Sequence, residues 1–398
     1  MTRSRTMEAS AVIIGGGIVG GTTAYYLARR GIRTVLLEKA TIGAGASARS
    51  AGGVRAQCRN RLERRLAMAS IELWTGLEGE LDVDMEYTQG GNIRLAISEA
   101  RLAQLRAEAE EELADGLIVE VWDRDELRRR APYLSDLFIG AKYCATDGIA
   151  NPILATRGFA LAASRSGTTL LTHTEAVDIE VRGGQVTAVL ARKRDEELRI
   201  ETPRLIHCGG AWTPLLDRAL GIHIPVEPAR TFIGVTQPIP FLFTEFLSSH
   251  DLRLYVRPAR KGHIHIGAVG TTKGTFDQRV PTEALAHLAR GALMVPALRS
   301  TNFLRTWAGT LAMTPDHLPI IGPVDGIQGY LLAAGFSGHG FCLGPIVGKL
   351  LSELVADGEP SISLDWLNLS RFMDLPPIRD NINGVDINSC TTGPEKYS

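Results

Sequence analysis

Residues 11–38, AVIIGGGIVGGTTAYYLARRGIRTVLLE, decide the fold of this chain. The apolar run at 11–14 predicts a buried strand, and the stretch 18–30 repeats its apolar residues at helical spacing until Gly31. A second apolar strand follows at 34–37 and ends at Glu38. A strand, a glycine turn, a helix and a strand in this order form a βαβ unit, which indicates an α/β fold with a parallel sheet.

The turn between the first strand and the helix predicts a dinucleotide site. Gly15, Gly17 and Gly20 are spaced as GxGxxG, so that one glycine makes the turn, one lets the backbone approach a pyrophosphate and one lets helix and strand pack closely. The helix N-terminus adds N–H groups for the phosphates. Glu38 follows about twenty residues later, where an acid binds ribose hydroxyls. This unit alone does not distinguish NAD from FAD.

Composition sets broad limits on the class of protein. With 44% apolar and 22% charged residues and a net charge of −1, the chain is typical of globular proteins, and no overall field favours nucleic acid. No apolar run reaches the roughly 20 residues of a membrane span, and no signal segment precedes the first strand. We therefore expect a cytoplasmic protein without an integral membrane segment, with peripheral contact with the inner membrane left open.

The cysteines predict a reducing compartment and no metal site. Their number is odd and they are scattered without a CxxC pair: Cys58, Cys144, Cys208, Cys342 and Cys390. His263 and His265 alternate along one predicted strand, so they share a face, which we expect to be exposed. Residues 84–96 are expected to form two strands around Gly90 and Gly91.

Two later glycine clusters change the cofactor prediction. The second glycine cluster, Gly209 and Gly210, follows another apolar strand at 205–208. The third cluster, GFSGHGF, occupies 335–341. Glycine lets the backbone come close to a ligand. Three such places along the chain suggest a long ligand held at several points, which favours FAD over NAD.

Five segments of the chain resemble those of a known family. The segments GGGIVGG (15–21), GAGASARSAGG (43–53), IHCGGAW (206–212), MTPDHLPIIG (313–322) and AAGFSGHGF (333–341) occur in the same order in the D-amino-acid-oxidase-like superfamily of FAD-dependent oxidoreductases. The form MTPDHLPIIG is most similar to the β-type subunits of heteromeric opine oxidase, proline dehydrogenase, sarcosine oxidase and hydrogen cyanide synthase. The resemblance covers about residues 10–372.

The resemblance implies a two-domain architecture. The implied fold is α/β, with a discontinuous FAD-binding Rossmann-like domain of the glutathione-reductase type and an α+β substrate domain built on an antiparallel sheet. We expect segments 9–84, 146–224 and 301–372 to form the FAD-binding domain and segments 85–145 and 225–300 to form the substrate domain. Residues 373–398 are polar and lack periodicity, so we expect a flexible C-terminal tail.

Site residues are carried over motif by motif. The resemblance implies that Tyr255, Arg55 and His339 line the substrate or flavin region as candidate catalytic residues. The residues implied to bind FAD are Gly15, Gly17, Ile18, Val19, Gly20, Glu38, Lys39, Ser47, Ala48, Gly52, Gly53, Val54, Val177, Gly210, Trp212, Gly335, Gly338, His339, Gly340 and Phe341.

Two departures from the family pattern are informative. Gly309 stands at or near the place where monomeric sarcosine oxidase has its flavin-linking cysteine, so we expect FAD to be held without a covalent bond at that site. Leu311 and Ala312 stand where glycine oxidase has an arginine for the substrate carboxylate. Carboxylate recognition by that arginine is therefore not expected.

The resemblance implies oxidation of a C–N bond to an imine by hydride transfer to the flavin. We expect an amino acid or a secondary-amine amino acid of the opine, proline or sarcosine class as substrate. The chain would then be the catalytic β subunit of a heteromeric dehydrogenase or opine oxidase, with an α-type second subunit carrying the electron acceptor. One alternative is a stand-alone glycine or D-amino-acid oxidase that uses oxygen. Another is an FAD-binding assembly protein without turnover.

Overall fold

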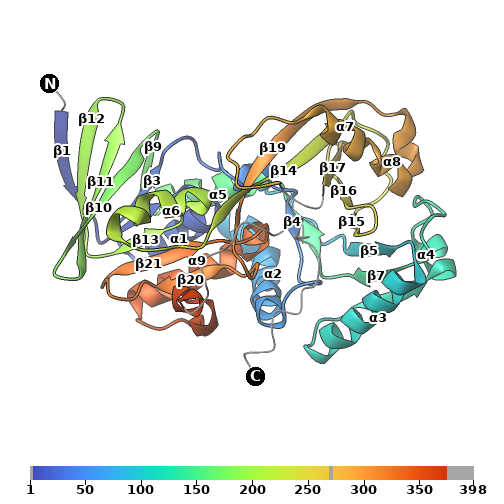
Figure 1. Cartoon of the computed structure of the whole chain (residues 1–398), viewed down its shortest axis with the longest axis horizontal. Coiled ribbons are helices and arrows are strands. Elements are labelled where there is room, and N and C mark those ends of the chain that lie inside the picture. The colour runs from blue at the N-terminus through green and yellow to red at the C-terminus, as the bar shows by residue number, and fades with distance from the viewer. Residues whose placement is uncertain (1–2, 269–271, 374–398) are drawn as a thin grey trace.

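A six-stranded sheet in the middle of the molecule contains the βαβ unit predicted from residues 11–38 (Figure 1). The computed structural model describes residues 3–268 and 272–373. The strand order is β20 (Ile320–Pro323), β21 (Tyr330–Ala334), β13 (Leu205–His207), β2 (Ala11–Ile14), β3 (Thr34–Glu38) and β9 (Thr169–Thr172). All neighbouring strands are parallel except β20, which runs antiparallel to β21. The predicted α/β class is therefore confirmed.

Helices cover one face of this sheet and a smaller sheet covers the other. The helices are α1 (Ile18–Arg29), α5 (Pro152–Arg165), α9 (Gly340–Ala356) and α2 (Arg61–Leu81). The four-stranded sheet has the order β1 (Arg3–Glu8), β12 (Glu196–Glu201), β11 (Gln185–Lys193) and β10 (Glu175–Arg182). Along β2, Ile13 packs in the cluster with the helices, whereas Val12 and Ile14 pack toward the four-stranded sheet. Side chains that alternate across a strand thus build two cores, which explains why this strand is apolar throughout.

A nine-stranded, mostly antiparallel sheet forms the other half of the molecule, at the right of Figure 1. Its order is β18 (Thr272–Lys273), β14 (Glu227–Thr236), β17 (Ile264–Ala268), β16 (Leu254–Pro258), β15 (Phe246–Ser249), β5 (Asn92–Ala96), β7 (Gly140–Cys144) and β6 (Glu120–Asp123), with β19 (Phe303–Met313) also paired to β14. The helices of this half are α3 (Glu99–Ala114), α4 (Arg124–Arg130), α7 (Thr282–Ala289) and α8 (Gly291–Met294). A two-stranded ladder of β4 (Gly53–Val54) and β8 (Gly148–Ile149) and the short helix α6 (Thr213–Asp217) complete the longer elements.

The pairing of β19 affects one boundary of the proposed division into two domains. β19 pairs with β14 from Phe303 to Met313, so a boundary at 301 would separate two hydrogen-bonded strands. We therefore move the proposed boundary at 300/301 to a position after Met313 and keep the other expected boundaries. The expected flexible tail lies outside the described residues, apart from Met373.

Two local expectations differ from the structure. Residues 84–96 contain one strand, β5, instead of two, because Thr88 forms an isolated bridge with Ile149 rather than a hairpin across Gly90 and Gly91. β1 was not expected, since its sequence RSRTME is polar, yet it pairs in parallel with β12. Both cases depend on a partner that is distant in sequence.

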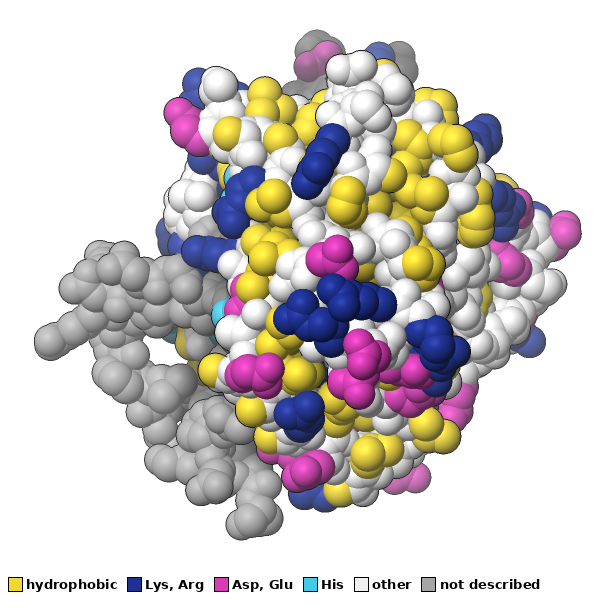
Figure 2. Space-filling view, turned by 90° about the vertical axis from the view of Figure 1, so that its right-hand side faces the viewer, with side chains coloured by type: hydrophobic (Ala, Val, Ile, Leu, Met, Phe, Trp, Pro, Cys, Tyr) yellow, Lys and Arg dark blue, Asp and Glu magenta, His cyan; other side chains and the backbone are white. Residues whose placement is uncertain are grey.

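The described residues on the face of the molecule in Figure 2 form no large patch of only acidic or only basic side chains. There, acidic and basic side chains are interspersed among apolar ones, as the net charge of −1 implies. None of the helices within the described part of the chain is long and apolar enough to cross a membrane.

Candidate active site

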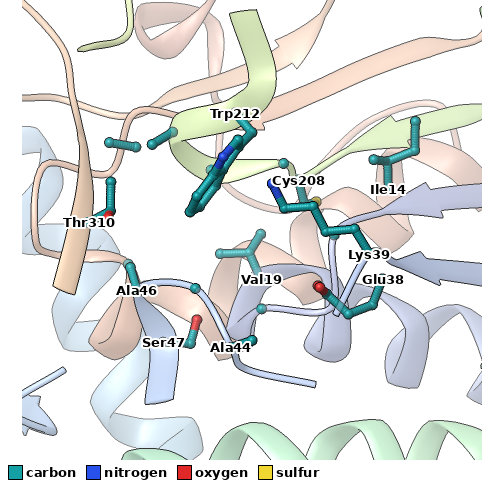
Figure 3. Close-up of a pocket in the computed structure, with 18 of the residues that line it drawn as sticks. Ile14, Val19, Glu38, Lys39, Ala44, Ala46, Ser47, Cys208, Trp212 and Thr310 are labelled. Atoms are coloured by element: carbon teal, nitrogen blue, oxygen red, sulfur yellow. The ribbon is translucent and has the colours of Figure 1, made fainter. Parts of the chain in front are cut away.

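A cavity of about 630 Å³ opens at the carboxyl ends of β2, β3 and β13 and reaches β19 in the other half of the molecule (Figure 3). At one end its wall includes Val177 and Arg192, from two strands of the four-stranded sheet. At the other end it includes Thr310 and Leu311 of β19. The carboxyl ends of parallel strands are the usual place for a nucleotide in such folds. The cavity therefore joins the predicted nucleotide turn to the predicted substrate sheet.

The glycine turn is shaped so that no side chain fits there. Gly15 has φ of +105°, and a Cβ built on it would lie 2.3 Å from the carbonyl oxygen of Cys208. A Cβ on Gly20 would lie 1.9 Å from the carbonyl oxygen of Gly15. These contacts explain two of the three glycines of the motif: Gly15 is required for the turn and Gly20 for the approach of helix to strand.

Glu38 and Ser47 hold the turn from two sides. Glu38 Oε2 accepts a hydrogen bond from the Gly16 amide at 2.8 Å, and its Oε1 accepts one from the Ala40 amide at 2.7 Å. Ser47 Oγ accepts a hydrogen bond at 2.9 Å from the amide of Ile18, the first residue of α1. The Glu38 carboxylate is thus fixed in the cavity wall by the backbone.

Two helices begin in the cavity wall. Gly17 and Ile18 at the start of α1, and Gly340 and Phe341 at the start of α9, all line the cavity. The helices pack closely at two glycines of α9: a Cβ on Gly344 would lie 2.6 Å from Ile18 Cγ1, and one on Gly348 would lie 2.4 Å from Thr22 Oγ1. Thr22 Oγ1 also donates to the Gly344 carbonyl oxygen at 2.8 Å. First-turn N–H groups lack acceptors within their own helix, and the N-terminal end carries partial positive charge. The cavity therefore suits an anionic ligand.

Trp212 and Lys39 also line the cavity (Figure 3). The Lys39 Nζ atom lies 3.8 Å from the centre of the Trp212 ring, a cation–π contact. Partial burial lowers the pKa of Lys39 below its usual value, although the nearby acids Glu175 and Glu38 act in the opposite direction. A cation and a flat ring thus lie together in the cavity wall, with the cation on the same side as Glu38.

The far end of the cavity, beside the nine-stranded sheet, was largely missed by sequence reasoning. Arg49 lines it and donates from Nε to the Ala44 carbonyl at 3.2 Å and from Nη1 to the Ala308 carbonyl at 2.9 Å. Gln278 also lines it and donates to Thr310 Oγ1 at 3.2 Å. Nothing in the local sequence marks Gln278 or Thr310, because only the pairing of β14 with β19 brings this region to the cavity.

The structure brings many predicted cofactor residues together. The following line the cavity: Gly15, Gly17, Ile18, Val19, Glu38, Lys39, Ser47, Val177, Gly210, Trp212, Gly338, Gly340 and Phe341. The others lie outside its wall: Gly20, Ala48, Gly52, Gly53, Val54 and Gly335 of the cofactor set, together with Arg55, Tyr255 and His339. Most of the outer glycines serve packing; a Cβ on Gly52, for example, would lie 2.1 Å from the Ala150 carbonyl oxygen.

None of the three candidate catalytic residues lines the cavity: Arg55 and Tyr255 are buried, and His339 is half-buried. His339 Nδ1 lies 2.8 Å from a carboxylate oxygen of Glu63, which also pairs with Arg59 at 3.2 Å. Burial lowers the pKa of His339 to about 4 despite the nearby Glu63, and His339 and Arg59 lower that of Glu63 to about 2 against the effect of its burial. Arg55 donates to the Gln57 carbonyl at 3.1 Å. Tyr255 stacks on Phe246 in a small apolar cluster.

The cavity fits FAD as the resemblance implies. Three features of the structure support this fit: a glycine cradle that a Cβ would fill, two helix N-termini for phosphates, and a long shape that runs from β10 to β19. At Gly309, near which the resemblance places a flavin-linking thiol in one relative, the Cα hydrogens pack toward Arg49 Cβ, so this strand supplies no thiol at that position. The residues that would hold FAD are those of the cavity wall.

The comparisons with known proteins agree with this geometry. Residues 10–354 match the family model described as "FAD dependent oxidoreductase". The chain is 29% identical over 373 residues to glycine oxidase of Bacillus subtilis, covering 91% of this chain and 96% of the relative. It is 30% identical over 411 residues to hydrogen cyanide synthase subunit HcnC of Pseudomonas protegens, covering 92% and 96%. The crystal structure of L-proline dehydrogenase from P. horikoshii superimposes with a TM-score of 0.87 at 31% identity, covering 92% of this chain and 98% of that one.

Proposed function

The chain belongs to the FAD dependent oxidoreductase family, and on this premise we propose that it is the catalytic β-type subunit of a heteromeric amino-acid dehydrogenase. The coarser statement is established by the family and its relatives: the protein is an FAD-dependent oxidoreductase of amines or amino acids. The proposal adds the substrate class, a secondary-amine amino acid such as an opine, proline or sarcosine, and a second subunit that takes the electrons. We also propose a cytoplasmic location.

One observation carries the proposal. A single cavity is lined both by the nucleotide turn, at Gly15 and Gly17, and by β19, at Thr310 and Leu311. A cofactor bound at the turn therefore extends to a sheet that can hold a substrate against it. Bound FAD supplies an acceptor for the hydrogen and electron pair removed from the carbon next to the amine nitrogen.

The residues of this chain would bind the cofactor, orient the amine and form the wall around both. The start of α1 would bind the phosphates and Glu38 the ribose hydroxyls, since its carboxylate is already oriented by two backbone amides. The start of α9 places the positive end of a helix at the cavity, near Gly338, where negative charge is stabilised. Leu311 makes part of the far wall apolar. Alignment of the amine, rather than a strong acid or base, is the main contribution of the protein to this chemistry.

The relatives support both the proposal and its main alternative. One relative is named as a subunit and a solved structure as a proline dehydrogenase, which favours a heteromeric dehydrogenase. Glycine oxidase is equally similar and favours a stand-alone oxidase. The family assignment and these relatives do not favour the other alternative, a non-catalytic assembly protein.

Reoxidation of the reduced protein separates these functions. The purified FAD-loaded chain is mixed without oxygen with a panel of proline, sarcosine and opines, and then exposed either to oxygen or to an artificial electron acceptor. We expect fast reoxidation by the artificial acceptor and slow reoxidation by oxygen, together with a second chain that co-purifies from the native source. Fast reoxidation by oxygen with peroxide release from the lone chain would instead establish an oxidase. The absence of any reduction by the panel would favour the assembly protein.

A further inference from the structure

Arg257, on β16, is a buried cation without an acidic partner among the described residues. Its side chain is in the interior, with the whole residue 4% exposed. Nη1 donates to the Pro258 carbonyl oxygen at 3.1 Å, and Nη2 lies 3.1 Å from His265 Nδ1. The Nε–H group is buried and has no hydrogen-bond partner. A buried charge of this kind is costly unless a partner of opposite charge joins it.

His265 holds Arg257 and stays neutral while doing so. Burial and the adjacent Arg257 lower the pKa of His265 to about 2, so its Nδ1 accepts the hydrogen bond from the guanidinium. Burial also lowers the pKa of Arg257, to about 10, which leaves it charged at neutral pH. The strand face of His263 and His265 was expected to be exposed, but both residues are half-buried in the structure. The Arg257 charge is thus retained inside the protein without a carboxylate at ion-pair distance among the described residues, although Glu86 raises its pKa through a longer-range interaction.

The strand register places Arg257 on the face of the nine-stranded sheet that looks toward the cavity. Arg257 pairs with His265, while Tyr255 pairs with Gly267 two positions along, so these four residues share one face. Through β17 and β14 the same face continues to Trp307, which pairs with Ile233 on β14.

Trp307 connects this face to the far end of the cavity. Its Nε1 donates to the Arg49 carbonyl at 3.3 Å, and Arg49 lines the cavity beside Leu311. On the other side, the ring of His265 meets the edge of the Trp307 ring, with 5.7 Å between the centroids. Arg257 therefore lies behind one aromatic layer from the cavity wall.

Another cation at this end of the cavity, Arg49, already has hydrogen-bond acceptors. Arg49 donates from Nε and Nη1 to two backbone carbonyls, whereas the Nε of Arg257 has no acceptor. Leu311, which stands in the wall itself, cannot bind an anion.

If the substrate is an amino acid, its carboxylate needs a cation at this end of the cavity. Arg230, which pairs with Thr310, also has a buried Nε without an acceptor, but it already forms an ion pair with Asp277 at 2.9 Å. Arg257 has an unpaired Nε and no such ion pair with a described residue.

We infer that Arg257, oriented by His265, receives the carboxylate of the substrate and restricts this site to amines that carry an anionic group. The inference rests on the proposed function only in taking the bound molecule to be an amine that is oxidised. It assigns carboxylate recognition to the sheet strand β16 instead of to position 311.

Acetate and acetamide test the inference without turnover, because they differ in charge but hardly in shape. Each is titrated into the FAD-loaded protein while the absorption spectrum of the flavin is followed. We expect acetate, and not acetamide, to perturb the spectrum of the wild type with saturation. In Arg257→Met the dissociation constant for acetate should rise at least tenfold. In Arg257→Lys, which keeps the charge but loses the planar fork, it should rise less.

One further variant serves as a control, and another tests the competing cation. Arg305→Met removes an exposed arginine from β19 and should bind acetate like the wild type. Arg49→Met alters the cavity wall itself, and any loss of acetate affinity in it should be smaller than in Arg257→Met. Wild-type protein that does not discriminate acetate from acetamide would overturn the inference, as would Arg257→Met with unchanged affinity. Loss of binding in Arg49→Met, with binding retained in Arg257→Met, would also overturn it and assign the carboxylate to Arg49.

The test remains decisive if one variant is unstable. Should Arg257→Met fail to retain FAD, Arg257→Lys decides, and unchanged acetate affinity in that variant contradicts the inference. Failure of the proposed function has a different signature. A protein that binds acetate through Arg257 but is reduced by no amine would contradict the proposed oxidation and leave carboxylate recognition standing.

Discussion

Glu38 Oε2 accepts a hydrogen bond from the Gly16 amide at 2.8 Å, which ties the end of β3 to the turn after β2. The same carboxylate accepts a second hydrogen bond from the Ala40 amide at 2.7 Å. The acid expected to bind the ribose therefore also shapes the loop expected to bind the phosphates. Because one carboxylate serves both roles, a substitution of Glu38 tests ribose binding and the shape of the loop together.

Replacing Glu38 by alanine should weaken FAD binding. Hydrogen bonds to charged groups contribute about 1.5–3 kcal/mol each, so losing one such bond to the ribose would raise the dissociation constant for FAD roughly tenfold to hundredfold. The measurement is a titration of apoprotein with FAD, followed by quenching of flavin fluorescence. Glu72→Ala, on the exposed face of α2, is the control and should bind FAD like the wild type. An unchanged affinity in Glu38→Ala would contradict the predicted role.

A methyl group on Gly20 should not be tolerated, whereas one on Gly76 should be. The Cβ of an alanine at position 20 would lie 1.9 Å from the Gly15 carbonyl oxygen, so α1 and the turn must move apart. Gly76 lies in α2, is exposed and has nothing within 4 Å of such a Cβ. Gly76→Ala should therefore stabilise the protein by about 0.5–1 kcal/mol. Thermal unfolding of both variants, with and without FAD, checks the pair; equal melting temperatures would refute the argument.

Trp212 and Lys39 should contribute unequally to cofactor binding. Removal of the cation in Lys39→Met should weaken FAD binding only a few-fold, because an exposed cation–π contact is worth about 0.5–1 kcal/mol. Trp212→Ala also removes a large ring from the cavity wall and should weaken binding more. Trp212→Phe, which retains a ring, should fall between the wild type and the alanine variant. The same fluorescence titration ranks the three, and a larger loss in Lys39→Met than in Trp212→Ala would contradict this assignment.

His339 should make folding stability depend on pH below neutrality. Its pKa is about 4 in the folded protein, below the usual value of 6.5, so the unfolded chain binds the extra proton first and stability falls as the pH drops from 6.5 to 4. The loss from this one group is on the order of 2–3 kcal/mol. In His339→Gln this contribution should be absent, although the depressed pKa of His265 adds a further loss that both proteins share.

Urea unfolding at pH 7 and at pH 5 provides the measurement for His339. The quantity compared is the difference in unfolding free energy between wild type and His339→Gln, which removes contributions common to both proteins. Asp147 is one such contribution, because burial raises its pKa to about 6 and acts in the opposite direction. A difference that does not change between the two pH values would show that His339 titrates as it does in water.

Local signals in the sequence were sufficient for the nucleotide-binding half. The predicted helix 18–30 is confirmed as Ile18–Arg29, and the predicted strands 11–14 and 34–37 as β2 and β3. These elements pair with one another or pack locally, so glycine spacing and apolar periodicity are enough to define them. The motifs also led to the correct family, fold class and cofactor, and some of their glycines, such as Gly15, Gly20 and Gly52, are required by close backbone contacts.

The far end of the cavity could not be predicted in the same way. Gln278 and Thr310 come together through the antiparallel pairing of β14 with β19, and Arg257 meets His265 through the register of β16 with β17. Register between strands depends on packing of whole faces and is not written in any short motif. His339 belongs to a cofactor motif, but its pairing with the Glu63 carboxylate, outside the cavity wall, is not visible in that motif.

The most direct test of the proposed function is an anaerobic titration of the FAD-loaded chain with proline, sarcosine and opines, followed by the absorption of the oxidised flavin. We expect at least one of these amines to bleach the flavin completely, with one molecule of substrate consumed for each flavin and an imine or its hydrolysis product released. A flavin that dithionite reduces but that none of these amines bleaches would contradict the proposed function.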